Sequence, residues 1–171
     1  MDGLVNRIEQ SGLIQLDLSH EASAVGRAAL DLAPALWQGL ALREKDFRQW
    51  LKALDGAPFE GCAVALHCSA EAVLPEWAWM LATQAIHAAA PTVHSVHHCA
   101  PADLGGPLLL AVVEQIDVET YRDALLVVKG CGLQSGPTAS MRLIERLRPV
   151  VKSLMFGEAC STVPIYKRPR S

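Results

Sequence analysis

The sequence predicts an α/β protein: a mostly parallel β-sheet with helices on both faces, a Rossmann-like layered sandwich, preceded by a less regular N-terminal segment. From Glu60 onward, short apolar runs alternate with longer stretches in which apolar residues recur at helical spacing. The short runs are almost entirely apolar, which is typical of strands buried on both faces of a parallel sheet. No linker, internal repeat or low-complexity segment divides the chain. We therefore expect one domain, residues 1–171.

The first 60 residues predict three elements. Leu13–Leu18 alternates between apolar and polar residues like a half-buried strand, and Leu36–Leu42 is a candidate for a second strand. Lys45–Leu54 has the spacing of an amphipathic helix. Its apolar face is expected to consist of Phe47, Trp50, Leu51 and Leu54.

The middle of the chain predicts a strand, a helix and a second strand. Cys62–His67 is a short apolar run that begins directly after Gly61, and we interpret it as a buried strand. Pro75 suits the first turn of a helix, and Pro91 cannot continue one, so a helix is expected between them. Thr92–His97 is the next expected strand.

The last third predicts two helices and a strand between them. The first helix, Leu108–Ile116, is opened by the Gly-Gly-Pro sequence at 105–107. Ala124–Lys129 is a nearly all-apolar strand. Thr138–Leu154 is expected to be a helix that Pro149 bends.

Composition narrows the possible functions. Of the 171 residues, 51% are hydrophobic and 19% are charged, and the formal net charge is −3. The high apolar fraction excludes a disordered chain, and the lack of a basic excess argues against a nucleic-acid partner. The first residues, MDGLVNRIEQ, do not resemble a signal peptide. The longest uncharged span, Trp77–Ala102, contains four histidines, so we expect neither a membrane helix nor a membrane partner. Without a signal peptide, we expect a cytoplasmic location.

Two cysteines stand just after the ends of expected strands. In an open parallel sheet, ligands bind beyond the carboxyl ends of the strands. Cys68 comes after the strand Cys62–His67, and Cys131 comes after the strand that ends at Lys129. If both strands belong to one parallel sheet, the two thiols lie at the same edge.

The residues around these thiols leave several interpretations open. Gly130, Gly132 and Gly136 form a G-x-G-x-x-x-G loop that is consistent with a tight turn or with an anion site made of backbone amides. A nucleophilic Cys68 is a further alternative, and it would need a base, for which His97 and His98 are candidates.

The remaining histidines and cysteines suggest packing more than ligation. His94, His97 and His98 look like a metal cluster, but successive residues of a strand point to opposite faces, so at most two of these side chains can converge. Cys62 begins a strand and is expected in the core, and Cys99 is expected in a loop. An odd count of five cysteines without a C-x-x-C pair favours reduced thiols.

Four segments resemble a known family. They are LREKDFR (42–48), CSAEAVLPEWAWM (68–80), VVKGC (127–131) and GEACSTVPIYKR (157–168). Together they resemble the bacterial family of unknown function numbered twenty-four eighty, over nearly the whole chain. The genes of that family commonly lie near those of SUF-type iron–sulfur cluster assembly, so the resemblance implies iron–sulfur assembly proteins as partners.

The resemblance also selects three cysteines, Cys68, Cys131 and Cys160, because each lies inside a family motif. Three thiolates with one open position imply a site for zinc or for an iron–sulfur cluster. The fourth ligand or a supporting group is expected among residues close in sequence to these cysteines: Ser69, Glu71, Lys129, Glu158 and Thr162.

The expected function is that of a metal- or iron–sulfur-cluster-binding accessory protein. Two alternatives remain: an enzyme with a cysteine nucleophile or a persulfide carrier, and a non-catalytic adaptor whose cysteines are structural. The shared site requires the stretch from Leu154 to Cys160 to return across the sheet. It also requires the three sulfurs to lie within about 6–7 Å of one another, against ~3.8 Å around a tetrahedral zinc ion.

Overall fold

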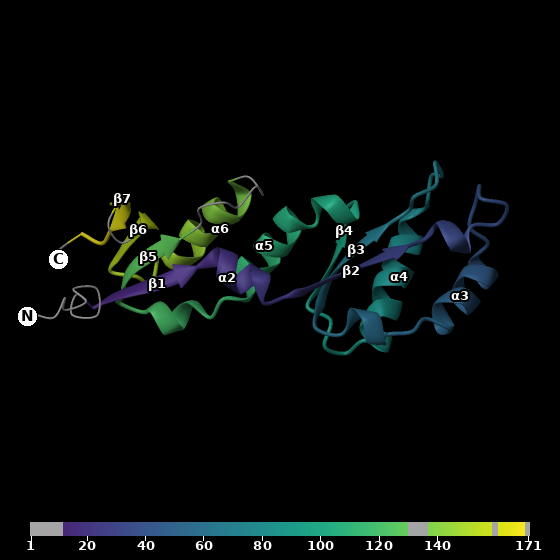
Figure 1. Cartoon of the computed structure of the whole chain (residues 1–171), viewed down its shortest axis with the longest axis horizontal. Coiled ribbons are helices and arrows are strands. Elements are labelled where there is room, and N and C mark those ends of the chain that lie inside the picture. The colour runs from purple at the N-terminus through teal and green to yellow at the C-terminus, as the bar shows by residue number, and fades with distance from the viewer. Residues whose placement is uncertain (1–11, 130–136, 159–160, 170–171) are drawn as a thin grey trace, which may run out of the picture. The chain divides into compact units, whose positions relative to one another are not determined.

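The computed structural model describes residues 12–129, 137–158 and 161–169. The chain divides into two compact units, residues 24–108 and residues 1–23 with 109–171. The division falls inside the helix α5 (Gly105–Gln115), after Leu108. The expectation of a single domain stays a prediction. Figure 1 shows the elements along the chain.

The unit of residues 24–108 is built on a parallel sheet with the strand order β2-β3-β4. These strands are β2 (Gly26–Asp31), β3 (Cys62–His67) and β4 (Ser95–His98). The unit also contains two helices and three short 3-10 helices: α3 (Glu44–Lys52), α4 (Glu76–Ala89), η1 (Ala33–Ala35), η2 (Ala57–Phe59) and η3 (Pro101–Asp103). Because parallel strands need crossover connections, helices between the strands are expected here.

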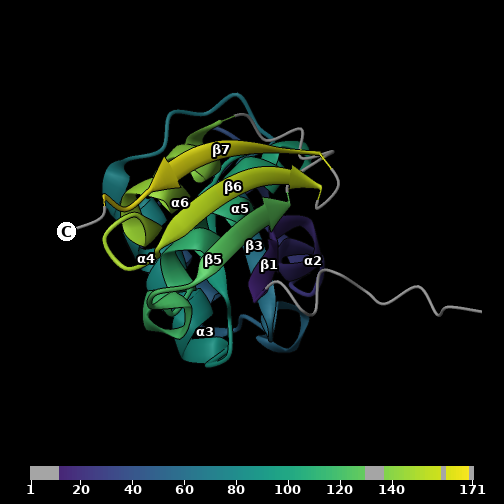
Figure 2. The same cartoon turned by 90° about the vertical axis from the view of Figure 1, so that its left-hand side faces the viewer.

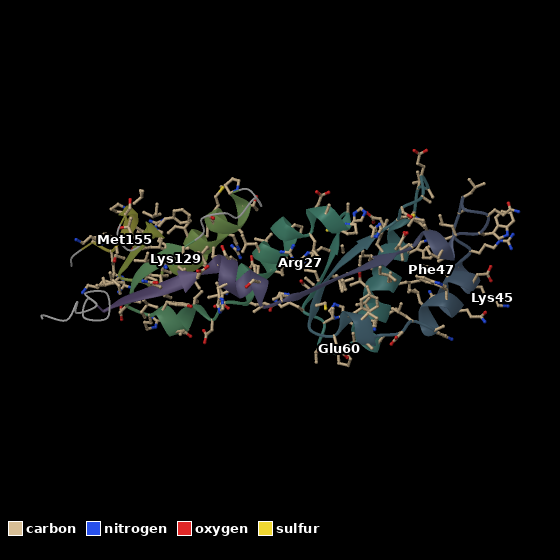
Figure 3. All side chains as sticks on the ribbon, viewed as in Figure 1. Arg27, Lys45, Phe47, Glu60, Lys129 and Met155 are labelled. Atoms are coloured by element: carbon tan, nitrogen blue, oxygen red, sulfur yellow. The ribbon has the colours of Figure 1, made fainter. Side chains whose placement is uncertain are left out.

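The core of this unit lies between one face of the sheet and the helices α3 and α4. Val64 and Leu66 are buried two residues apart on β3, so both side chains point to the same face. Phe47 of α3 is fully buried. Its ring stacks with Trp50 at 6.0 Å between centroids and meets Trp77 of α4 edge-on at 6.0 Å. Phe47 is labelled in Figure 3.

The other unit contains a four-stranded sheet with the order β1-β5-β6-β7. Its strands are β1 (Leu13–Asp17), β5 (Leu125–Lys129), β6 (Ser153–Glu158) and β7 (Ser161–Lys167). The first three are parallel, and β7 runs antiparallel to β6. Figure 2 shows β5, β6 and β7 side by side. The unit also contains α2 (Leu18–Ser23), η4 (Val118–Tyr121) and α6 (Thr138–Leu147).

The helix α6 buries one apolar face, and side-chain hydrogen bonds connect it to the end of α5. Ala139, Leu143 and Leu147 are buried at four-residue spacing, which places them on one face of α6. Arg146 donates hydrogen bonds to the carbonyl oxygens of Val113 and of Ile116, the latter at 3.0 Å. These two carbonyls at the end of α5 are therefore satisfied by a side chain.

The predicted α/β class with mostly parallel sheets is confirmed. The strand Cys62–His67 and the helix that follows Pro75 occur as expected. The strand Leu13–Leu18 and the helix Lys45–Leu54 are also confirmed, with ends that differ by one or two residues. In the described part of the chain, no helix is long and apolar enough to cross a membrane.

The pairing of the strands differs from the expectation. The strand that precedes Cys68 pairs with β2 and β4, whereas the strand that ends at Lys129 pairs with β1 and β6. The two strands thus belong to different sheets, and the expectation of a common edge for Cys68 and Cys131 is wrong. Alternation of strands and helices predicts parallel pairing, but it does not specify which strands are neighbours.

The helix expected over Thr138–Leu154 is too long. It ends at Leu147, and Ser153 already belongs to a strand. Pro149 follows the end of the helix instead of bending it, because proline cannot donate the backbone bond that a further turn requires.

The sequence pattern does not predict the strands β2, β6 and β7. Leu36–Leu42 forms only a bridge between Trp37 and Ala41.

A close backbone contact in the unit of residues 24–108 gives a stability prediction. Gly56 is buried, and a Cβ atom at this position would overlap the carbonyl of Ala89, at the end of α4. We expect Gly56→Ala to lower the free energy of unfolding by about 2 kcal/mol, because backbone must move. Urea unfolding measures this cost. Gly105→Ala is the control, because a Cβ atom there meets nothing within 4 Å. Equal stability of the two variants would contradict the prediction.

Candidate functional site

The carboxyl ends of β2, β3 and β4 lie at one edge of their sheet because the three strands are parallel. Asp31 ends β2, His67 ends β3 and His98 ends β4. Asp31 and His67 are partners in the register of β2 and β3. Cys68 follows His67 directly, so the thiol lies where parallel sheets commonly bind ligands. The position predicted for Cys68 at a strand end is therefore confirmed.

The carboxylate of Asp31 binds Ser69, the residue that follows Cys68 in the chain. Its Oδ1 atom accepts hydrogen bonds from the backbone N–H of Ser69 and of Ala33, both at 2.9 Å. Its Oδ2 atom accepts a hydrogen bond from the Ser69 hydroxyl at 2.5 Å. Both carboxylate oxygens are therefore engaged at the turn that carries the thiol.

These bonds set the ionisation of Asp31. Burial by itself raises the pKa of this carboxyl group. The bonds from the Ser69 hydroxyl and from the backbone of Ala33 and Ser69, together with the nearby His67, outweigh burial and hold the pKa below its ordinary value of 3.8. The carboxylate is thus ionised at neutral pH, and its bonds to Ser69 and Ala33 are charge-assisted.

Cys68 itself is a half-buried free thiol. Its side chain packs against the apolar core of the unit. Its Sγ atom lies 3.7 Å from the carbonyl oxygen of Ala70, to which the thiol donates a weak hydrogen bond. The sulfur is therefore held within the turn, and the residue that carries it is neither fully buried nor fully exposed.

In the other unit, the carboxyl ends of three neighbouring strands also meet at one edge. Asp17 of β1 pairs with Lys129 of β5, and β5 pairs with β6, which ends at Glu158. Cys131 is two residues beyond Lys129, and Cys160 is two residues beyond Glu158. Both cysteines lie outside the described residues, as do Gly130, Gly132 and Gly136 of the glycine-rich loop.

The histidines in and next to β4 have partners within their own unit. The Oγ atom of Ser95 lies 3.0 Å from Nδ1 of His94 and 2.8 Å from Nε2 of His97. The ring of His98 packs on Trp79 at 4.3 Å between centroids. Burial lowers the pKa of His94 and of His97, and for His97 the neighbouring His94 lowers it further. The expectation that His97 and His98 face opposite ways agrees with these different partners.

The residues suggested as supporting groups have varied surroundings. Ser69 is bound to Asp31, and the hydroxyl of Thr162 lies 3.7 Å from the sulfur of Met155. Glu71 is exposed, and Lys129 ends β5. Among residues 12–129, 137–158 and 161–169, no three His, Cys, Asp or Glu side chains are grouped so that they could hold a metal ion.

The two cysteines outside the family motifs have different environments. The expectation of a core position for Cys62 is only partly met, since the residue is half-buried and its thiol donates to the carbonyl of Glu60 at 3.4 Å. It stands at the start of β3, where the sheet covers it less than the residues that follow. Burial raises the pKa of Cys99, and Asp103 raises it further, so this thiol ionises less readily than a free cysteine.

Sequence reasoning missed Asp31. A local signal was present: Asp31 begins the sequence Asp-Leu-Ala-Pro, and Asp55 begins the similar Asp-Gly-Ala-Pro. Both carboxylates accept a hydrogen bond from the N–H of the alanine two residues on, at 2.9 and 3.0 Å. This pattern predicts a turn but not the additional bonds of Asp31 to Ser69, which is 38 residues away.

The fold and the cysteine motif at a strand end define an α/β protein with mostly parallel sheets and a thiol-bearing turn at the carboxyl edge of one of them. The chain matches the family described as "Protein of unknown function (DUF2480)" over residues 2–168, and it therefore belongs to this family. Among curated proteins and among solved structures, none matches the chain.

The lowered pKa of Asp31 predicts a pH-dependent contribution to stability. An ionised Asp31 stabilises the folded state at pH values above its ordinary value of 3.8, and this stabilisation is lost as the pH falls through the lower pKa of the folded state. Asp31→Asn keeps the shape but removes the charge. We expect the wild type to be more stable than Asp31→Asn at neutral pH, with the difference shrinking below about pH 4. Urea unfolding across this pH range measures the difference. A difference that grows in acid would contradict the prediction.

Proposed function

We propose that this protein is a metal- or iron–sulfur-cluster-binding accessory protein whose ligands are the thiolates of Cys68, Cys131 and Cys160. The observation that carries the proposal is a common placement in the chain. Each cysteine comes one or two residues after the end of a strand that pairs in parallel with a neighbour: Cys68 after β3, Cys131 after β5 and Cys160 after β6.

The chemistry of three thiols limits the metal. Soft thiolate ligands favour zinc or iron–sulfur clusters over magnesium or calcium. Three protein ligands leave one position open, which a neighbouring side chain, a partner protein or a transferred cluster can fill. An open position suits a protein that receives and passes on its metal, and iron–sulfur assembly proteins are the partners that we propose.

The ends of β5 and β6 support a common site for two of the ligands. The two strands are direct neighbours, and paired strands lie ~4.8 Å apart. Two residues of chain span at most ~7 Å, so the length of the two segments permits both thiols to approach one metal ion. Lys129 and Glu158, the last described residues before these cysteines, fix where the two segments start.

Cys68 is the ligand that needs the most direct test, because it belongs to the unit of residues 24–108. Its thiol is half-buried and stands in a turn that Asp31 holds in place. This arrangement is more typical of a preorganised ligand than of a thiol buried only for packing. The alternatives are a nucleophilic enzyme and an adaptor with structural cysteines, and the packing of Cys68 against the apolar core is the observation that favours the second. The candidate bases His97 and His98 have Ser95 and Trp79 as partners.

Metal analysis of protein purified without oxygen tests the proposal. We expect close to stoichiometric zinc or iron in the wild type. Cys68→Ala, Cys131→Ala and Cys160→Ala should each lose most of the metal, because the site cannot hold it as well when one of its three thiolates is removed. Elemental analysis and visible absorption spectra measure metal and cluster content.

Cys62→Ala and Cys99→Ala are the matched controls, because they remove thiols outside the family motifs. Both should keep the metal of the wild type. Loss of metal in either control would show that the ligands are chosen wrongly. Metal-free wild-type protein whose melting temperature does not change after chelation would contradict the proposed function.

A further inference from the structure

We infer that Asp31 is a positioning residue for Cys68, acting through Ser69 and not as a ligand. This inference rests on the proposed function for its purpose, since it assigns to Asp31 and Ser69 the task of holding one ligand in place. We refer to these two residues as the Asp31–Ser69 clamp.

The residue before Cys68 and the residue after it are each attached by hydrogen bonds, and the clamp is the second of these attachments. On one side, the carbonyl oxygen of His67 accepts a hydrogen bond from the N–H of Leu32 at 2.8 Å. On the other side, the N–H and the hydroxyl of Ser69 donate to Asp31 at 2.9 and 2.5 Å. Both sequence neighbours of Cys68 are thereby bound to the end of β2. The backbone of Cys68 has little freedom between these two attachments.

The bonding of Asp31 argues against a direct role as a ligand. One carboxylate oxygen already accepts two backbone N–H groups, and the other accepts the Ser69 hydroxyl. Three of the roughly four lone-pair sites of the carboxylate are thus occupied by charge-assisted bonds, which are about twice as strong as neutral ones and leave little room for a metal ion. Asp31 therefore affects the thiol through the turn that it holds.

A comparison with Asp55 shows which hydrogen bonds of Asp31 belong to the local turn. The Asp-x-Ala-Pro sequences at 31–34 and 55–58 both lead into 3-10 helices, η1 and η2, through the same bond to an alanine N–H. An aspartate is thus explained at either position by the turn alone. The bonds to Ser69, across 38 residues, are the additional feature of Asp31. Asp55 is therefore a matched control for the loss of the turn.

Fixing a ligand has a measurable effect on metal affinity. A ligand that is already oriented loses less conformational freedom when the metal binds. Replacing a residue that orients a metal ligand typically weakens affinity by about 10–100-fold. Ser69 is the sharper position for a test, since Ser69→Ala removes only the hydroxyl bond, whereas Ser69→Thr keeps a hydroxyl group.

The experiment has two readouts on the full chain. The first is zinc affinity by competition with a chelator. Asp31→Asn and Ser69→Ala should bind zinc about 10–100-fold more weakly than the wild type. Ser69→Thr and Asp55→Asn should bind zinc about as tightly as the wild type. Rescue by threonine at position 69 would show that the hydroxyl group, and not the size of the side chain, carries the effect.

The second readout does not depend on metal. The rate at which Cys68 is alkylated in metal-free protein is followed by mass spectrometry of the peptide that contains it. Because Cys68 is half-buried, a loosened turn should expose the thiol. Ser69→Ala and Asp31→Asn should therefore react several-fold faster than Ser69→Thr and Asp55→Asn.

The two readouts separate the two claims. If the wild type binds no zinc but the alkylation rates differ as expected, the proposed function fails and the clamp stands. If zinc binds but Ser69→Ala matches the wild type in both affinity and alkylation rate, the clamp is overturned and the proposed function stands.

Discussion

Parallel pairing of strands is the constraint on which the arrangement of this protein depends. A parallel neighbour brings the carboxyl ends of two strands to the same edge of a sheet, and the connection must cross back before the next strand begins. In the unit of residues 24–108, this places Asp31 of β2 beside His67 of β3. The turn after His67 then lies within hydrogen-bond distance of the Asp31 carboxylate, and the position of Cys68 follows from that turn. In the other unit, the same rule makes the ends of β5 and β6 neighbours.

Local elements were predictable where the sequence marks both of their ends. The strand Cys62–His67 is an uninterrupted apolar run that follows a glycine, and the structure gives it the same bounds. The helix beginning at Thr138 was predictable at its start but not at its end. Val150 and Val151 are buried although the helix has already ended at Leu147. The apolar residues alone did not show where the helix ends and where the segment that leads to the next strand begins.

Strand partners were not predictable, because they depend on contacts between distant residues. Leu13 of β1 is the register partner of Leu125 of β5, and the run of residues that forms β1 does not specify this partner. The candidate site shows the same limit. Cys68 was predictable from its place after an apolar strand, whereas Asp31 was not, because its bond to Ser69 exists only once β2 and β3 are paired.

The central claim is that thiolates of Cys68, Cys131 and Cys160 bind one metal centre. X-ray absorption spectroscopy of metal-loaded protein, prepared without oxygen, tests it most directly because it reports the type and distance of the ligand atoms. For zinc, the claim predicts a shell of three sulfur atoms at ~2.3 Å, with at most one lighter ligand. A first shell of nitrogen and oxygen atoms, without sulfur, would contradict it.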